Sequence, residues 1–183
     1  PNYSDNYYWH LKPYEAPEPR IGLAGFMPNS ESLKIAGERG YIPLSFNVAP
    51  EHVAVHWDVV ERSALRVNRK PDRSKWRHIR EIFVADTTEE AEKAVLQGFA
   101  AEFWNTYFQV IVERLGIADF YRRDGAPKDV PVDTDFLVKN GTWFVGDPDK
   151  VVEQIVEQYE LSGGFGVLLQ MGFDYSDPNM RDR

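Results

Sequence analysis

Arg20-Ile21-Gly22-Leu23-Ala24-Gly25-Phe26-Met27-Pro28-Asn29-Ser30-Glu31-Ser32 is the stretch on which a prediction of the fold rests. A short apolar run ends at Gly25, a turn rich in Pro, Asn and Ser follows, and a helical pattern begins with Ser30, Glu31 and Ser32 in its first turn. This order is typical of a strand, a loop and a helix N-terminus. The unpaired backbone N–H groups and the positive dipole end of such a helix attract a phosphate or carboxylate. Ordinary helix capping explains the same residues, and spacing alone favours it.

The composition restricts the classes of function that the chain can have. The chain has 183 residues, of which 43% are hydrophobic, enough for one folded domain with a core. Its formal net charge of −8 argues against nucleic acid or an anionic membrane surface as a partner. No apolar run approaches the roughly 20 residues that span a bilayer, so we expect no membrane association and a cytoplasmic location. The absence of cysteine excludes thiolate chemistry.

The chain alternates between apolar runs and helical patterns. Prolines make residues 1–19 an extended lead-in. The apolar runs predict strands at residues 20–24, 41–46, 76–85 and 165–171. Helices are predicted at residues 30–39, 50–68, 87–115 (with a break at Gly98) and 149–161, with one further turn at 135–140. Residues 117–134 lack a period and are predicted to form a long loop.

The order of these elements predicts a parallel sheet that helices bury on both faces. Four such strands form either a small doubly wound sheet or half of an eight-stranded barrel, and we treat residues 1–183 as a single domain. In both folds, ligands bind where strands end and helices begin. By that rule one rim of the sheet is expected to hold residues 25–32, 46–49, 86–88 and 170–177.

The helical region at residues 99–111 carries large apolar side chains on nearly all its faces. This pattern favours a buried helix. It leaves open a second interpretation, in which the helix walls a ligand cavity or a subunit contact.

The expected rim contains few groups suited to catalysis. His52 and His56 lie four residues apart on one predicted helix face, but no third ligand is evident, so we expect no metal site. Asp174 and Asp177 are interpreted as polar loop residues rather than ligands of a cation. What remains is an anion seat with aromatic and neutral polar side chains. This set suits an aromatic phosphorylated cofactor such as a flavin nucleotide.

Four stretches also resemble a known family. Residues 11–21 resemble the lead-in Leu-x-Pro-Tyr-x-x-Pro-x-Pro-x-Ile of the bacterial luciferase-like flavin monooxygenases, of the limonene and alkanal monooxygenase type. Residues 32–40, 80–91 and 145–170 agree with that family in order and spacing. The resemblance implies a (β/α)8 barrel of the TIM type, of which this chain covers about the last four strands and their helices. It also implies that the chain is the C-terminal half of a longer enzyme.

The resemblance implies a function as well. Members are two-component monooxygenases that use reduced FMN from a separate flavin reductase and oxidise a hydrophobic substrate with O2. An F420-dependent oxidoreductase of the same family is the first alternative, and a non-catalytic flavin-binding or partner subunit is the second. A small phosphate-binding α/β module outside the family is the third. Half a barrel exposes an open strand edge, so we expect a homo-oligomer or pairing with the missing N-terminal half.

Site residues follow from the same resemblance. The cofactor phosphate is expected at Gly25, Met27, Asn29, Ser30 and Ser32. Pro28 has no N–H, so one backbone contact of the family must be absent or shifted. The isoalloxazine or the substrate is expected near Phe46, Asn47, Gln170 and Gly172. No catalytic residue can be assigned, and we expect this chain alone to be inactive.

Overall fold

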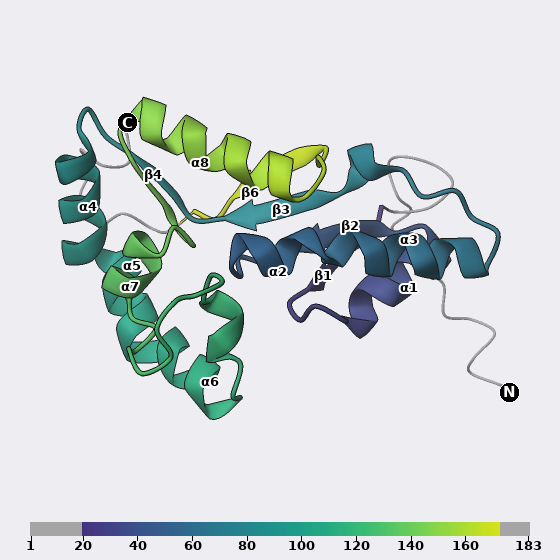
Figure 1. The fold of residues 1–183 in the computed structure, drawn as a ribbon, viewed down its shortest axis with the longest axis horizontal. Helices are drawn as coiled ribbons and strands as arrows, with labels where there is room; N and C mark the ends of the chain where they lie inside the picture. The colour runs from purple at the N-terminus through teal and green to yellow at the C-terminus, as the bar shows by residue number, and fades with distance from the viewer. Residues whose placement is uncertain (1–19, 173–183) are drawn as a thin grey trace, which may run out of the picture.

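A parallel sheet organises the computed structural model, which describes residues 20–172. The strand order is β1-β2-β3-β6, and every neighbouring pair is parallel (Figure 1). The strands are β1 (Gly22–Gly25), β2 (Ile42–Ser45), β3 (Arg77–Arg80) and β6 (Val167–Gln170). Within residues 20–172, β1 and β6 each pair with one strand only, so the sheet has two open edges. The predicted parallel arrangement of the strands is confirmed.

Helices α1 (Glu31–Arg39) and α3 (His56–Arg66) pack against each other beside this sheet. Helix α1 ends as the sequence predicts, because Gly40 adopts the left-handed conformation with φ of 72° and donates its N–H to the last carbonyls. Gly37 permits the close approach of the two helices. A Cβ atom at this position would lie 2.3 Å from the carbonyl oxygen of Val60.

The helix predicted at residues 50–68 is wrong in one respect. It divides at Val55 into α2 (Pro50–Ala54) and α3, and Pro50 occupies the first turn as expected. A short 3-10 turn, η2 (Arg73–Lys75), then leads into β3. The division lets the buried ring of His56 reach back toward β2, where its Nδ1 lies 2.9 Å from Ser45 Oγ.

The strand predicted at residues 76–85 is also two strands rather than one. It is interrupted at Glu81, where β3 ends and β4 (Ile82–Val84) begins. Strand β3 pairs with β6, whereas β4 pairs with β5 (Phe144–Gly146) in a separate two-stranded sheet. The interruption therefore marks a change of partner strand. The carbonyl of Glu81 accepts from Phe144 N at 3.0 Å, at the point where the second pairing starts.

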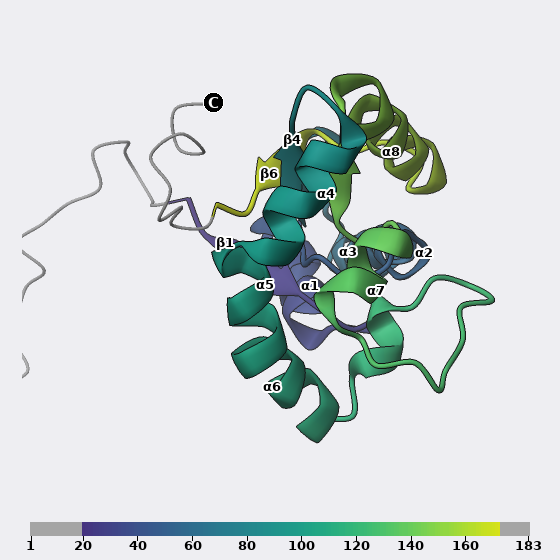
Figure 2. The same ribbon diagram turned by 90° about the vertical axis from the view of Figure 1, so that its left-hand side faces the viewer.

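A column of helices begins directly after β4 and precedes β5 in the sequence (Figure 2). Gly98 interrupts the helical region as predicted, and Thr87 caps α4 by accepting from Glu90 N through its side chain, which is one half of a capping box. The inward face of the column is buried at Trp104, while Phe99 and Tyr107 are exposed. The column consists of α4 (Thr88–Gln97), α5 (Phe99–Phe103), the π-helical turn η3 (Trp104–Phe108) and α6 (Gln109–Arg114).

The predicted loop at residues 117–134 contains a short helix and is anchored to its surroundings. The 3-10 turn η4 (Ala118–Tyr121) lies at its start, and α7 (Thr134–Lys139) follows it. Trp104 Nε1 donates to the carbonyl of Val132 at 2.7 Å, and Thr142 Oγ1 donates to the carbonyl of Tyr121 at 2.9 Å. These bonds fix both ends of the segment.

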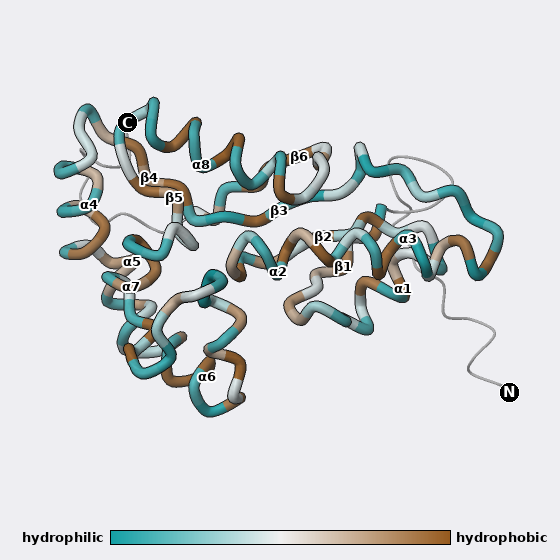
Figure 3. Tube along the Cα trace, viewed as in Figure 1, coloured by the Kyte–Doolittle hydropathy of each residue, from teal (hydrophilic) through white to brown (hydrophobic). Residues whose placement is uncertain are grey.

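Helix α8 (Pro148–Leu161) begins at Asp147, whose side chain accepts from Lys150 N. It contacts both strands of the second sheet and reaches α2. Apolar residues concentrate on β4 (Figure 3), whereas Val152 and Val156 of α8 are exposed. Across the described residues, no helix combines the length and apolar character that crossing a membrane requires.

Candidate functional site

The loop after β1 places a helix N-terminus at the carboxyl end of the sheet. Ser30 occupies the N-cap position of α1, but its side chain does not cap the helix. Instead, Ser30 Oγ lies 2.8 Å from Ser32 Oγ, and Ser32 Oγ donates to the carbonyl of Ala24. Ordinary side-chain capping, the simpler interpretation of the sequence, is therefore absent from this helix within the described residues. The first N–H groups of α1 remain available to an anion.

Pro28 fits this loop because its position needs no N–H. Ser30 N donates to the carbonyl of Met27 at 3.0 Å, which closes a four-residue turn with Pro28 as its second residue. Proline is favoured at that position because its ring presets the required φ. The side chain of Met27 is half exposed beside the turn.

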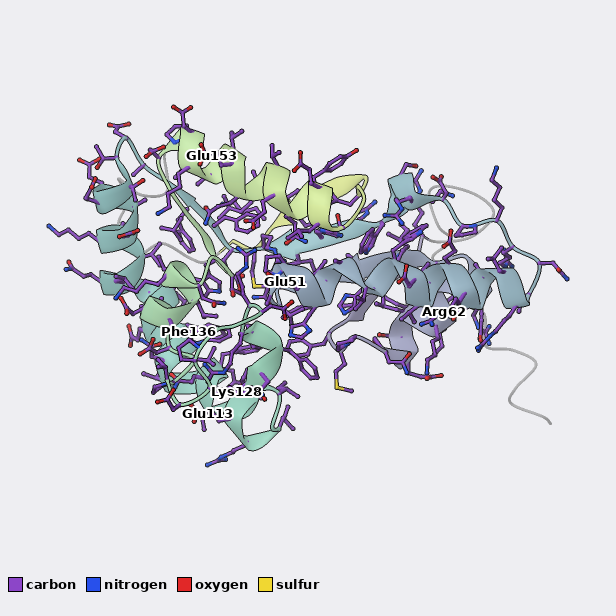
Figure 4. The ribbon with its side chains drawn as sticks, viewed as in Figure 1. Glu51, Arg62, Glu113, Lys128, Phe136 and Glu153 are labelled. Atoms are coloured by element: carbon purple, nitrogen blue, oxygen red, sulfur yellow. The ribbon has the colours of Figure 1, made fainter. Side chains whose placement is uncertain are left out.

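Cationic side chains lie close to the same helix. A cavity of about 270 Å³ is lined by Asn29 and Lys34 on one side and by Arg62 and Arg66 of α3 on the other. Arg62 is labelled on α3 in Figure 4. Lys34 pairs with Glu31 at 2.9 Å, so the positive potential added beside the α1 N-terminus comes from Arg62 and Arg66, and it favours an anionic ligand here.

The loop after β2 lies beside the loop after β1. Phe46 N donates to the carbonyl of Gly25 at 2.9 Å, and Ala49 N donates to the carbonyl of Phe120 at 2.8 Å. The ring of Phe26 packs on those of Phe46 and Tyr121, with centroids 5.8 and 5.5 Å apart. Three segments that are distant in sequence thus form an aromatic cluster at the carboxyl end of β1 and β2.

Two charged residues that the sequence analysis did not single out lie beneath this cluster. Arg80 and Glu81 are both buried. Arg80 donates through Nη1 to the carbonyl of Val48, and the side chain of Asn47 donates through Nδ2 to Glu81 Oε1. The last residue of β3 and the residue after it therefore hold consecutive residues of the loop after β2. The charged pair directly before the apolar run at residues 82–85 was the sequence signal for this arrangement.

Burial shifts the titration of both residues. It raises the pKa of Glu81 to about 7 and lowers that of Arg80 to about 10. Burial also raises the pKa of Tyr121, so this phenol stays neutral. Farther out, Arg123 bridges Glu51 at 2.9 Å and Glu157 at 2.5 Å, linking the segment after η4 to α2 and α8 (Glu51 is labelled in Figure 4).

The other predicted rim residues do not join the loops after β1 and β2. Gln170 is exposed at the end of β6 and donates through Nε2 to the carbonyl of Ile82 at 3.1 Å, and Gly172 is exposed two residues later. Residues 86–88 do not follow the main sheet, because β4 belongs to the second one. There Thr88 donates through Oγ1 to Asp147 Oδ2. The predicted loop residues Asp174 and Asp177 lie outside the described residues.

The histidine pair is built into the packing. The ring of His52 packs edge-on against Phe120, and Ser45 Oγ lies within hydrogen-bonding distance of both His56 Nδ1 and Trp76 Nε1. Burial lowers the pKa of His56 to about 4, so its imidazole is neutral. Residues 20–172 contain no group of three or more side chains that could hold a metal ion.

Comparison with known proteins gives consistent matches. The sequence profile of the luciferase-like monooxygenases matches residues 6–164. A 3,6-diketocamphane 1,6-monooxygenase of Pseudomonas putida is 35% identical over 167 residues, 91% of this chain and 44% of the relative. A 2,5-diketocamphane 1,2-monooxygenase of the same organism is 34% identical over 86% of this chain and 44% of its own length.

A solved structure extends the likeness to the fold. It is the oxygenating constituent of 3,6-diketocamphane monooxygenase of Pseudomonas putida, described as a type II Baeyer-Villiger monooxygenase in complex with FMN. The TM-score is 0.81 at 35% identity, covering 89% of this chain and 45% of that one. The chain thus spans about half the length of the relatives it matches.

Proposed function

The chain belongs to the luciferase-like monooxygenase family, and from that premise we propose that it is the cofactor-phosphate-binding part of an FMN-dependent two-component monooxygenase. The fold is that of a partial TIM-type barrel, with its ligand rim at the carboxyl ends of β1 and β2. The proposed reaction is oxidation of a hydrophobic organic substrate by O2. Reduced FMN, delivered by a separate flavin reductase, would supply the electrons for it.

The observation that carries the proposal is the uncapped N-terminus of α1 at the rim. The residues present there fit an FMN phosphate, since free N–H groups are joined by the nearby cations Arg62 and Arg66, while Lys34 pairs with Glu31. Of the predicted residues, Met27, Asn29, Ser30 and Ser32 belong to this loop or the first turn of the helix, and Gly25 ends the preceding strand. We assign them to phosphate binding.

The second part of the proposal concerns the ring system and the substrate. Phe46 lies in the aromatic cluster with Phe26, which offers an apolar surface next to the phosphate seat. Asn47 is held rigidly behind it. Gln170 and Gly172, at the end of β6, would approach from the opposite edge of the sheet. These residues would bind and orient the ligands and limit access of water to them.

The open edges of the sheet raise the question of what completes the barrel. The open edges of β1 and β6 would be completed either by the N-terminal half of the barrel or by a second copy of the chain. We propose the N-terminal half, since the relatives are about twice as long. The catalytic groups would then lie there, and the chain alone would be inactive. The full protein would act in the cytoplasm.

Flavin titration tests the function directly. FMN fluorescence is followed as the protein is added, with F420 in parallel. We expect FMN to bind with micromolar or tighter affinity, and O2 consumption only when a flavin reductase and the N-terminal half are present. Tight binding of F420 in place of FMN would favour the F420-dependent oxidoreductase. FMN binding without turnover in the complete protein would indicate a non-catalytic subunit, and no binding of either cofactor would overturn the proposal.

A further inference from the structure

Glu81 and Asn47 meet behind the rim, and each keeps one buried oxygen without a hydrogen bond. Their side chains are 2% and 1% exposed, and Asn47 Nδ2 donates to Glu81 Oε1. Among the described residues, Glu81 Oε2 and Asn47 Oδ1 have no hydrogen-bond partner. A buried polar atom without a partner is costly, so two of them on one bonded pair call for a physical explanation.

The protonation state of Glu81 provides that explanation. An ionised carboxylate only accepts hydrogen bonds, and so does the carbonyl oxygen of a carboxamide, so neither free oxygen can then satisfy the other. A proton on Glu81 Oε2 turns that oxygen into a donor toward Asn47 Oδ1. Together with the existing bond, this completes a ring of two antiparallel hydrogen bonds between a carboxylic acid and an amide. Both unpartnered oxygens are satisfied by one proton.

The surrounding charges permit the neutral form. The guanidinium of Arg80 bonds other acceptors, because its Nε and Nη2 donate to Gln158 Oε1 and its Nη1 donates to the carbonyl of Val48. Burial raises the pKa of Glu81 to about 7, against the lowering effects of a hydrogen bond from its own backbone, of the Arg80 charge and of the bond from Asn47. Tyr121, the other titratable group whose pKa responds to Glu81, is itself buried and neutral.

We propose that the neutral carboxyl of Glu81 and the carboxamide of Asn47 form a cyclic acid–amide pair that positions the loop at residues 46–49 for flavin and substrate. The pair follows from the contacts of this chain alone, whereas its effect on ligands rests on the proposed function. Arg80 holds the neighbouring residue Val48 from the other side. Glu81 is thus a positioning residue that acts through Asn47 and Phe46.

Ionisation of Glu81 breaks the pair. The carboxylate then places a negative oxygen against Asn47 Oδ1, and the carboxamide must turn or shift to avoid it. The groups that face Glu81 are Arg80 from β3, Asn47 from the loop after β2 and Tyr121 from η4. Of these, the arginine stays charged and the phenol neutral near pH 7. A change in loop geometry near pH 7 is therefore assigned to Glu81.

The first experiment needs no ligand. Protein labelled with 13C at the glutamate side-chain carboxyls is titrated by NMR from pH 5 to pH 9. We expect one glutamate signal to titrate near pH 7, well separated from the remaining glutamates, and to disappear in Glu81→Gln. Titration of every glutamate near its ordinary pKa would overturn the pair.

The second experiment links the pair to ligand binding. FMN affinity of the unaltered protein is expected to fall about tenfold between pH 6 and pH 8.5, as the pair is lost. In Glu81→Gln, an amide–amide pair with two hydrogen bonds persists at every pH, so the affinity should equal the unaltered value at pH 6 and stay constant. Glu81→Leu, which cannot pair, should bind weakly at both pH values.

The outcomes separate the two proposals. If FMN fails to bind the unaltered protein at any pH, the proposed function fails, and the NMR titration still decides the acid–amide pair. If FMN binds but Glu81→Gln keeps the pH dependence of the unaltered protein, the positioning role is wrong. A merely structural role would lower stability in Glu81→Gln without removing that pH dependence.

Discussion

Arg80 and Gln158 bind each other in the buried space between β3 and α8, although they lie 78 positions apart in the sequence. The Nε of Arg80 donates to Gln158 Oε1 at 3.1 Å, and its Nη2 donates to the same oxygen. The guanidinium also lies over the ring of Phe144, 5.4 Å from its centroid. A fully buried cation is therefore stabilised by neutral acceptors and an aromatic face.

Replacement of this acceptor should destabilise the fold strongly. Gln158→Leu keeps the approximate volume but leaves the Arg80 charge without its main partner, which costs roughly 3–5 kcal/mol by analogy with broken buried ion pairs. Urea unfolding measures the loss. Gln109→Leu is the matched control, because Gln109 bonds only the exposed Glu113 on α6, and its loss should change stability by less than about 0.5 kcal/mol. Equal effects of both substitutions would contradict the role of Gln158.

Glu81 should make stability fall as pH rises. The pKa of this carboxyl is about 7 in the folded protein against an ordinary 4.5, so the folded state holds a proton that the unfolded state has lost between these values. Its contribution is therefore complete below pH 4.5 and is lost as pH rises through 7. The free energy of unfolding of the unaltered protein, relative to that of Glu81→Gln, should therefore fall by roughly 3 kcal/mol over this range. A difference that is constant with pH would contradict the shift.

His56 and His78 should have the opposite effect on the acid side. Burial lowers their pKa values from 6.5 to about 4 and about 2, so the unfolded state binds protons that the folded state refuses. Their contribution is present above pH 6.5 and is lost as pH falls toward 4 and below. In Glu81→Gln, stability measured by urea unfolding should accordingly rise between pH 4.5 and 6.5 and then level off. His78→Phe should flatten this rise, and an unchanged slope would exclude His78 as its source.

Local patterns were sufficient to predict much of the fold. The apolar runs and the stop at Gly40 are properties of short segments, and both appear in the structure. The interruption at Glu81 could not be predicted in this way, because it depends on β5, which lies about sixty residues later and pairs with β4. The break at Val55 likewise depends on the contact of His56 with Ser45 of another strand.

The residues of the candidate site also differ in whether a local pattern or a distant partner determines them. Asn47 was identified because it follows a strand, and the structure places it at that rim. Arg80 and Glu81 were missed because the segment from residue 76 was interpreted as the alternating part of one strand that ends in the apolar run at residues 82–85. Their importance comes from partners in the loop after β2 and in α8, and no spacing rule relates those segments to one another.

Gly37 tests the packing of α1 on α3. An added methyl group would lie 2.3 Å from the carbonyl oxygen of Val60. This oxygen belongs to the helix backbone, so it cannot easily move away. Gly37→Ala should therefore cost roughly 1–3 kcal/mol of stability through overpacking, despite the better helix propensity of alanine. Gly172→Ala is the control, since no atom of the described residues lies within 4 Å of the added Cβ there. Thermal unfolding compares the two, and a stabilised Gly37→Ala variant would show that the helices separate easily.

The serines of the α1 N-terminus test the phosphate seat. Ser32 Oγ donates to the carbonyl of Ala24 and accepts from Ser30 Oγ, so the backbone N–H groups of α1 are the free donors. The Ser30 hydroxyl would reach a phosphate by turning away from Ser32. Ser30→Ala should weaken FMN binding by roughly 1–3 kcal/mol, as expected for a hydrogen bond to a charged group. Ser32→Ala should have a smaller effect, through the loop.

Thr87→Ala removes the cap of α4 and should lower stability while leaving FMN affinity unchanged. Fluorescence titration measures all three. An unchanged FMN affinity in Ser30→Ala would restrict the phosphate contacts to the backbone. If Thr87→Ala lost as much FMN affinity as Ser30→Ala, the measured affinities would report stability rather than contact with the phosphate.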